Sequence, residues 1–238
     1  LINLQEALAK SNNVFFYEMG NRIGIDNIEK YAKMFGLGQI TGIDLPGETK
    51  GLVASRAYKE KYYNEDWYIA ETFDAAIGQG FHLTTPIQLA MVLSQIANDG
   101  LYYKPHLVSK ITDTNNKVIK EITPTLVRKL NVSHKTLQLI RTSLRDASTI
   151  EGGTSYYHFK DFPIKVAGKT GTVENPHGKD HGLIMVFAPY DDPEIAIVVI
   201  IPQGGYGAVA AAPIAKKILE AIFNINQNPP ISKQSQQQ

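Results

Sequence analysis

The stretch from Ile164 to Glu174 constrains the fold more than any other part of this chain. It reads IKVAGKTGTVE, in which β-branched residues dominate and no proline follows Pro163, so we predict a strand. Glycines inside such a strand mark either a bulge or a close approach of the backbone to a ligand. Its KTGT run (169–172) offers a cation, two hydroxyl groups and backbone N–H groups. These groups suit a bound carboxylate and a carbonyl oxygen that becomes an oxyanion. The KTG tripeptide by itself favours a simpler interpretation, an exposed edge strand with a solvated lysine.

Length and composition exclude several classes of protein. The 238 residues suit one large domain, and 24 Lys and Arg against 23 Asp and Glu give no indication of nucleic-acid binding. The absence of cysteine excludes disulfides, thiolate zinc sites and a thiol nucleophile. The longest apolar run, 195–201, is too short to span a bilayer. Because the chain starts at Leu1 rather than methionine, we expect it to be a piece of a longer protein.

The first part of the chain predicts helices around a polar corner. Helix-forming residues 4–10 are followed by Ser11-Asn12-Asn13, which favour caps and turns, and then by the apolar and aromatic stretch 14–19. The corner is therefore expected between two helices. Asp26 is predicted to cap a further helix that ends near Gly36 or Gly38.

The middle of the chain predicts a buried helix and a second, amphipathic one. Thr85 before Pro86 is a helix start signal, and the helix over 87–98 is apolar on nearly all sides, as expected for the core helix of the domain. Residues 105–122 predict a strand pair, and Ser133 is expected to cap an amphipathic helix.

The last part predicts more strands, a helix and a tail. The stretches 183–188 and 195–201 are expected to pair as an antiparallel hairpin because their connection is short. An alanine-rich helix is predicted over 208–223. Residues 225–238 are rich in Pro, Gln and Ser and are predicted to be a disordered tail.

The motifs and their order resemble the transpeptidase domain of penicillin-binding proteins, whose motif set is SxxK, SxN and KTG. Within that family the chain is most similar to the class B enzymes of cell elongation. The resemblance covers almost all of residues 1–223, with 1–224 expected to be the C-terminal part of such a domain. The stretches that carry it are SNNVFFYEMGNRIGID (11–26), TGIDLPGE (41–48), IGQGFHLTTPIQLA (77–90), AGKTGT (167–172) and DHGLIMVFAPYDDPEIAIVV (180–199).

One departure from the family pattern concerns the nucleophile. In the family, the SxxK serine is the nucleophile and its lysine the general base, and both lie upstream of SxN. No Ser-x-x-Lys occurs in these residues. Its place would be before Leu1, so we expect this chain to hold only part of an active site. The segment was either removed or never present, and both alternatives stay open.

The resemblance implies a role for each matching residue. Ser11 would pass a proton to the departing amine, and Asn13 would hydrogen-bond the SxxK lysine and the substrate amide. Lys169 would supply positive charge near Ser11 and near the substrate carboxylate. The Thr170 and Thr172 hydroxyls would bind that carboxylate, and the Thr172 backbone N–H would be one oxyanion donor.

Four other residues have alternative interpretations. Gly171 would leave room for substrate, the alternative being a simple bulge, and the less favoured alternative for Ser11 is a helix cap or turn serine. We interpret Asp180 and His181 as an ion pair or hydrogen bond at the edge of the site rather than as catalytic groups. The six histidines are scattered without metal-ligand spacing, and no metal or cofactor is expected.

The resemblance implies an α/β (α+β) fold of the serine β-lactamase and transpeptidase type. We expect a mainly antiparallel sheet flanked by helices, with a helical lobe that holds the Ser11 corner. The implied function is peptidoglycan D,D-transpeptidation in cell-wall elongation, at the periplasmic face of the inner membrane, through an anchor outside this chain. Stem peptides and β-lactams would be its ligands, and a membrane glycosyltransferase and scaffold proteins its partners. The alternatives are a D,D-carboxypeptidase or β-lactamase, or a non-catalytic β-lactam sensor or wall-binding module.

Overall fold

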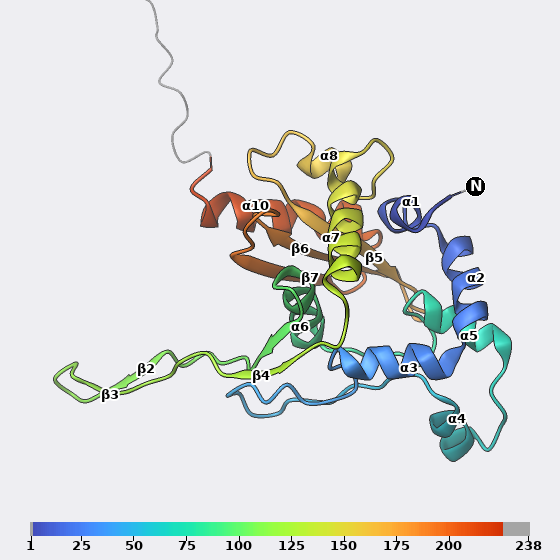
Figure 1. The fold of residues 1–238 in the computed structure, drawn as a ribbon, viewed down its shortest axis with the longest axis horizontal. Coiled ribbons are helices and arrows are strands. Elements are labelled where there is room, and N and C mark those ends of the chain that lie inside the picture. Colours follow the sequence, from blue (N-terminus) through green and yellow to red (C-terminus); the bar gives the residue numbers. More distant parts are fainter. Residues whose placement is uncertain (1, 226–238) are drawn as a thin grey trace, which may run out of the picture.

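Three strands form the main antiparallel sheet of the computed structural model, which describes residues 2–225 (Figure 1). They are β5 (Ala167–Val173), β6 (His181–Ala188) and β7 (Ile195–Ile201), in the order β5-β6-β7. The register between β5 and β6 runs without interruption from Ala167 opposite Phe187 to Val173 opposite His181. Since β6 is the middle strand, β5 has a free edge within the described residues. The predicted strand and the predicted hairpin are both confirmed.

The two faces of this sheet are buried under different helices. Successive side chains of a strand point to opposite faces. Ile184 and Val186 of β6 pack with α8 (Tyr156–Phe159) and α10 (Ala212–Ile222), whereas Phe187 packs on the other face. That other face is covered by α6 (Pro86–Ala97) and α7 (His134–Thr149). Each fully buried large apolar side chain contributes about 1.5–3 kcal/mol.

Local sequence signals determine where the two covering helices begin. Thr85 caps α6, its Oγ1 accepting from the Gln88 N–H while the Gln88 Oε1 accepts from the Thr85 N–H. The result is a capping box, and Pro86 needs no partner because it has no N–H. Ser133 caps α7 by accepting from the Thr136 N–H. Both predicted helix starts are confirmed.

The five N-terminal helices form the lobe that adjoins the sheet. They are α1 (Leu4–Ala9), α2 (Asn13–Ile23), α3 (Ile25–Met34), α4 (Arg56–Tyr63) and α5 (Ile69–Ala76). α1 packs against α7, and α2 packs against α5. Among the described residues, no helix is both long and apolar enough to cross a bilayer.

Gly20 brings α2 and α5 close together. A Cβ at this position would lie 2.7 Å from the Cβ of Ala76 and 3.3 Å from the carbonyl oxygen of Thr72. Real Cβ atoms do not approach so closely, so only glycine allows this packing. The contact fixes the position of α5 relative to α2.

Two predicted helix boundaries are wrong. The cap of α3 is Gly24, with φ 74°, rather than Asp26, which lies in the first turn and pairs with Arg56 at 3.2 Å. The predicted helix 208–223 is divided into α9 (Gly207–Ala210) and α10, with Ala211 between them. The cause is Pro213, whose missing N–H and fixed ring disfavour a helix that continues through it.

Two short strand pairs project from the helices that cover the sheet (Figure 1). β2 (Lys110–Thr112) pairs with β3 (Val118–Glu121), which confirms the predicted strand pair over shorter bounds. β1 (Leu101–Tyr103) pairs with β4 (Leu126–Lys129), a pairing that was not predicted. The predicted tail lies outside the described residues beyond residue 225.

Candidate active site

Ser11 lies on a sharp corner where α1 ends and α2 begins. Its N–H donates to the Leu8 carbonyl at 3.3 Å, and the Asn12 N–H donates to the Ala7 carbonyl at 2.9 Å. This pair of bonds is a Schellman motif, whose C′ residue adopts the left-handed conformation and is usually glycine. Here it is Ser11, with φ 55°. A non-glycine residue in this conformation costs about 1 kcal/mol. The protein keeps this strain at Ser11, where the corner holds a hydroxyl group in place.

Asn12, and not Ser11, caps the next helix. The Asn12 Oδ1 accepts from the Phe15 N–H at 2.9 Å, which satisfies a backbone donor in the first turn of α2. The Ser11 hydroxyl therefore stays available for another partner. The predicted corner between two helices is confirmed. Ser11 does not cap α2, but it does lie in the turn, as the alternative interpretation allowed.

Lys169 of β5 provides the partner of the Ser11 hydroxyl. Its Nζ donates to the Ser11 Oγ at 2.8 Å and to the Thr170 carbonyl oxygen at 2.6 Å. Burial lowers the pKa of Lys169 from its usual 10.5 to about 8, because the charged ammonium loses hydration. Within residues 2–225 no carboxylate pairs with this ammonium. Most of it is nevertheless charged at pH 7, which places a half-buried cation beside a hydroxyl group.

The free edge of β5 presents backbone groups next to this pair. The Thr172 carbonyl oxygen accepts from the Nε2 of Gln79 at 3.3 Å, so it points away from β6. In a strand, the N–H and C=O of one residue point to the same side. The Thr172 N–H therefore also points to the free edge, which is the orientation an oxyanion donor requires.

The two threonine hydroxyls have different surroundings. Thr170 is buried, with 9% of its surface exposed. The half-buried Thr172 accepts at its Oγ1 from the Gly207 N–H at 3.4 Å. A Cβ on Gly207 would lie 2.2 Å from the Gly171 carbonyl oxygen, so only glycine lets α9 approach β5 this closely. Carboxylate binding by these hydroxyls stays a prediction.

The glycines of β5 mark close packing between strands. The register of β5 with β6 is continuous, so the bulge considered for Gly168 and Gly171 is wrong. A Cβ on Gly168 would lie 2.5 Å from the Met185 carbonyl oxygen of β6. A Cβ on Gly171 would lie 3.1 Å from the side chain of Leu183. What approaches the backbone at these positions is the neighbouring strand.

Asn13 is the first residue of α2 and its side chain is exposed. Among residues 2–225 no hydrogen bond joins it to Ser11 or Lys169. The structure thus brings Ser11 and Lys169 together and leaves Asn13 beside them on the same corner. Its predicted bonds to an SxxK lysine and to substrate stay predictions.

Gln79 is a site residue that the sequence analysis did not select. It lies between Gly78 and Gly80, whose φ values of 79° and 69° are both in the left-handed region. Two glycines around one polar residue at the end of a helix were the available signal. The turn brings the Gln79 amide to Thr172, 93 residues away.

The histidines near the site hold loops in place. The Nδ1 of His181 accepts from the Gln203 N–H at 2.9 Å, and the Oδ1 of Asp180 accepts from the Asn175 N–H at 3.4 Å. His82 accepts from the Ala54 N–H at 3.3 Å, and burial lowers its pKa. In the described part of the chain, no group of three or more His, Cys, Asp or Glu residues could hold a metal ion.

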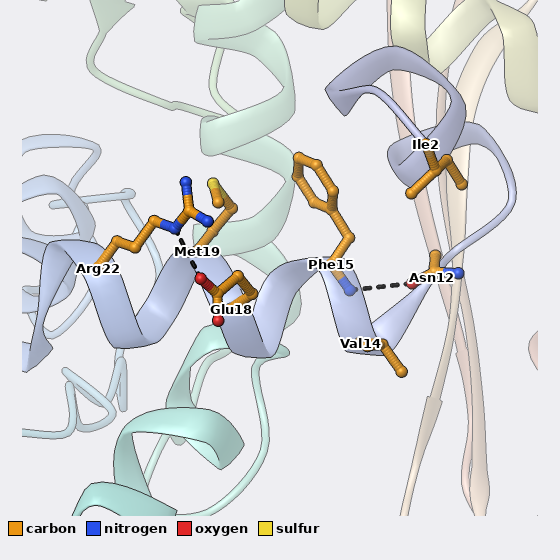
Figure 2. A pocket seen from close by; sticks show the side chains of 7 residues that line it. All are labelled: Ile2, Asn12, Val14, Phe15, Glu18, Met19 and Arg22. Atoms are coloured by element: carbon orange, nitrogen blue, oxygen red, sulfur yellow. Dashed lines mark hydrogen bonds and ion pairs between the residues drawn. The ribbon is translucent and has the colours of Figure 1, made fainter.

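A shallow hollow follows one side of α2, beside the Ser11 corner. Figure 2 shows its lining, which includes the ion pair between Glu18 and Arg22 at 2.7 Å. It has a volume of about 720 Å³ and a mostly apolar lining of Ile2, Val14, Phe15 and Met19, with Asn12 at one end. Neither Ser11 nor Lys169 lines it, so the hollow is separate from the site.

Comparison with known proteins agrees with this arrangement. A family model described as the penicillin binding protein transpeptidase domain matches residues 1–220. The peptidoglycan D,D-transpeptidase MrdA of Salmonella typhimurium is 32% identical over 94% of this chain, and that of Escherichia coli K12 is 30% identical over 93%. The chain spans 38% and 37% of the length of these two relatives.

Solved structures of similar proteins have the same fold. Helicobacter pylori PBP2 in complex with MreC has a TM-score of 0.82 at 29% identity, covering 94% of this chain and 40% of that one. Pseudomonas aeruginosa PBP2 in complex with WCK 5153 has a TM-score of 0.81 at 30% identity, covering 93% and 47%. A peptidoglycan synthase complex contains a chain with a TM-score of 0.85 at 30% identity, covering 97% and 39%. From the Ser11 corner, the Lys169 strand and these matches, we conclude that the chain belongs to the penicillin-binding protein transpeptidase domain family.

Proposed function

We propose that the full-length protein is a peptidoglycan D,D-transpeptidase that cross-links stem peptides during cell-wall elongation. The observation that carries the proposal is the hydrogen bond from Lys169 to Ser11, because it places a half-buried cation against a hydroxyl on a rigid corner. Such a pair can move a proton without exposing it to bulk water. The relatives named as D,D-transpeptidases support the reaction class.

The proposed reaction is acyl transfer through a serine ester. Residues 1–238 contain no Ser-x-x-Lys, and the proposal places the nucleophile serine in other residues of the full-length protein. Its Oγ gives its proton to the lysine of the same segment and attacks the carbonyl carbon between the two D-alanines, and the C–N bond breaks to release D-alanine, whose nitrogen gains a proton. The amine of a neighbouring stem peptide then attacks the ester, which forms the cross-link and frees the serine.

Ser11 and Lys169 serve the leaving group in this scheme. The Lys169 ammonium donates to the Ser11 oxygen, so the Ser11 O–H is free to donate to another acceptor. That acceptor is the departing nitrogen, which must gain a proton to leave as an amine. Lys169 in turn keeps the Ser11 oxygen polarised and adds positive charge for the terminal carboxylate. Asn13 orients the lysine of the nucleophile segment.

The β5 edge stabilises charge on the substrate. The Thr172 N–H faces the free edge and is proposed as one of two oxyanion donors. Removing one such donor costs roughly a hundredfold or more in rate. The Thr170 and Thr172 hydroxyls are proposed to bind the terminal carboxylate, which requires that Thr170 become accessible.

Partners and location are proposed from the relatives. The H. pylori PBP2 structure contains MreC, and another match is part of a peptidoglycan synthase complex. We propose a scaffold protein and a membrane glycosyltransferase as partners of the full-length protein. Its catalytic domain would face the periplasm, anchored to the inner membrane by a segment outside this chain.

The test is labelling of the full-length protein with a fluorescent penicillin. Wild-type protein is expected to be labelled at one site and to release the adduct slowly in a chase. Lys169→Ala should reduce the rate of labelling by about a hundredfold or more and leave the fold intact. The matched control is Lys165→Ala, since Lys165 lies just before the same strand in an exposed ion pair with Asp191 at 2.7 Å.

Three outcomes would contradict the proposal. Wild-type protein that is never labelled would exclude a penicillin-reactive enzyme. Loss of the adduct within seconds would indicate hydrolysis, as in a β-lactamase or carboxypeptidase. A steep fall in melting temperature with labelling retained would make Lys169 a structural residue.

A further inference from the structure

A second hydrogen bond joins the helical lobe to β5 beside the Lys169–Ser11 pair. The Gln79 Nε2 donates to the Thr172 carbonyl oxygen at 3.3 Å. This distance is longer than the usual 2.9–3.0 Å of an N–H···O bond, so the bond is weak. The bond nevertheless occupies an acceptor on the free edge of β5.

The backbone of Gln79 is held in place by a hydrogen bond, and the residue is half-buried. The Gln79 N–H donates to the Asp74 carbonyl at 2.9 Å, at the end of α5. α5 is itself held against α2 by the close contact of Gly20 with Ala76. Gly78 and Gly80 on each side carry no side chain that would block rotation of the glutamine. The amide can therefore leave Thr172 without movement of the helices.

The Thr172 carbonyl is also the acceptor that an extended ligand would use. A peptide lying along a free strand edge pairs through its own N–H groups with outward-pointing carbonyls. β6 occupies the inner side of β5, so Gln79 and such a ligand both approach this oxygen from the outer side. A carbonyl oxygen can accept two hydrogen bonds, but a ligand N–H in line with the strand would meet the Gln79 amide on this side.

We propose that Gln79 is a specificity-determining residue that donates to the Thr172 carbonyl in the ligand-free protein and is displaced by the amide N–H of an acyl-peptide ligand. The inference rests on the proposed function, since it assumes that the acyl donor lies along the β5 edge. Until a ligand arrives, Gln79 satisfies a carbonyl of an unpaired strand edge, a kind of edge that otherwise invites wrong pairing. For a ligand with an N–H at this position, the gain in binding free energy is only the difference between its own hydrogen bond and the one that Gln79 gives up.

The experiment compares two penicillins on the full-length protein. Benzylpenicillin carries a side-chain amide N–H, whereas its N-methylated amide analogue cannot donate. The second-order rate constant of acylation is measured for wild type, Gln79→Ala and Gln79→Met, of which Met keeps the length but lacks the donor. Gln138→Ala is the control, because Gln138 makes a similar 3.4 Å bond to Asp99 elsewhere. Thermal melting verifies that each variant is folded.

Both Gln79 variants are expected to react about two- to threefold faster with benzylpenicillin, the lower end of the range for one hydrogen bond, because the Gln79 bond is weak. Their rate with the N-methylated analogue, and both rates of the control variant, should match wild type.

An equal fall in the acylation rate with both penicillins would mean that Gln79 only supports the strand, and would overturn the inference. Faster acylation of Gln79→Ala but not of Gln79→Met would mean that the size of the side chain, and not its donor, is responsible. That result would overturn the inference too. Unchanged rates would also overturn it. Wild-type protein that no penicillin acylates would overturn the proposed function itself.

Discussion

The Nζ of Lys169 donates a 2.8 Å hydrogen bond to the Oγ of Ser11 across 158 positions of sequence. The lysine comes from the edge strand of the sheet, and the serine from the corner between two helices of the lobe. The bond therefore depends on how the sheet and the lobe pack. Substitutions of Ser11 or Lys169 can test each side chain without changing that packing.

Replacing Ser11 separates the hydroxyl from the conformation that holds it. Ser11 has φ 55° at a position that favours glycine, so Ser11→Gly should keep the free energy of unfolding within about 1 kcal/mol of wild type. Ser11→Ala retains the strain and should be less stable than Ser11→Gly. Both should lower penicillin acylation about a hundredfold, because both lack the hydroxyl. Urea unfolding and acylation rates provide the two measurements, and a glycine variant that acylates normally would contradict the role of Ser11.

Stability should rise with pH through the titration of Lys169. Its folded pKa of about 8 lies below its usual value of 10.5, so the unfolded chain binds more protons between these pH values. The free energy of unfolding therefore increases from about pH 8 to about pH 10.5, as the cost of the buried charge disappears. Lys169→Met lacks this titration, so the difference between the two proteins should change over that window. A constant difference in urea unfolding would contradict the lowered pKa.

Acylation should fall over the same pH range. If the charged Lys169 polarises Ser11, the rate declines about tenfold per pH unit above the pKa of about 8. Lys169→Arg should be slower at all pH values, but its alkaline decline should move upward because a guanidinium stays charged. The measurement is the acylation rate from roughly pH 6 to pH 10, within the pH range in which the protein stays folded. Identical alkaline declines in both proteins would assign the titration to another group.

Gly20→Ala should loosen the contact between α2 and α5. The added Cβ would meet the Ala76 Cβ at 2.7 Å, so the free energy of unfolding should fall by about 1–3 kcal/mol. Acylation should fall as well, because α2 begins at the Ser11 corner. The double variant with Ala76→Gly removes the clash and should recover part of both losses. A double variant no better than Gly20→Ala would show that this contact is not the cause.

Gln88 of α6 tests how much a buried amide contributes by holding the segment between α3 and α4. Its Nε2 donates to the carbonyls of Gln39 at 2.7 Å and Lys50 at 2.8 Å, and its Oε1 accepts from the Thr85 N–H. Gln88→Leu leaves these backbone groups unpaired and should lower the free energy of unfolding by about 2–4 kcal/mol. Gln138→Leu, at a partly exposed position, should change it by less than about 0.5 kcal/mol. Equal effects in urea unfolding would contradict the argument.

Local signals in the sequence were sufficient for most elements and for part of the site. Thr85 and Ser133 cap helices through bonds to residues three positions away, so their neighbours in sequence decide the outcome. The β-branched run around Lys169 predicts its strand for the same reason. The motif order led to the family, and the assignment of Ser11 and Lys169 to one site followed from that resemblance.

Long-range packing decided what the sequence by itself did not. Gln79 meets Thr172 through the packing of segments 93 residues apart in sequence, and no local pattern encodes that contact. The closeness of β6 accounts for the β5 glycines without a bulge, whereas room for substrate at Gly171 stays a prediction. The lowered pKa of Lys169 likewise comes from burial by distant segments. The sequence by itself determined the local elements, because caps and strand propensities act over a few residues. Tertiary structure decided contacts and electrostatics, because these depend on which distant surfaces exclude water together.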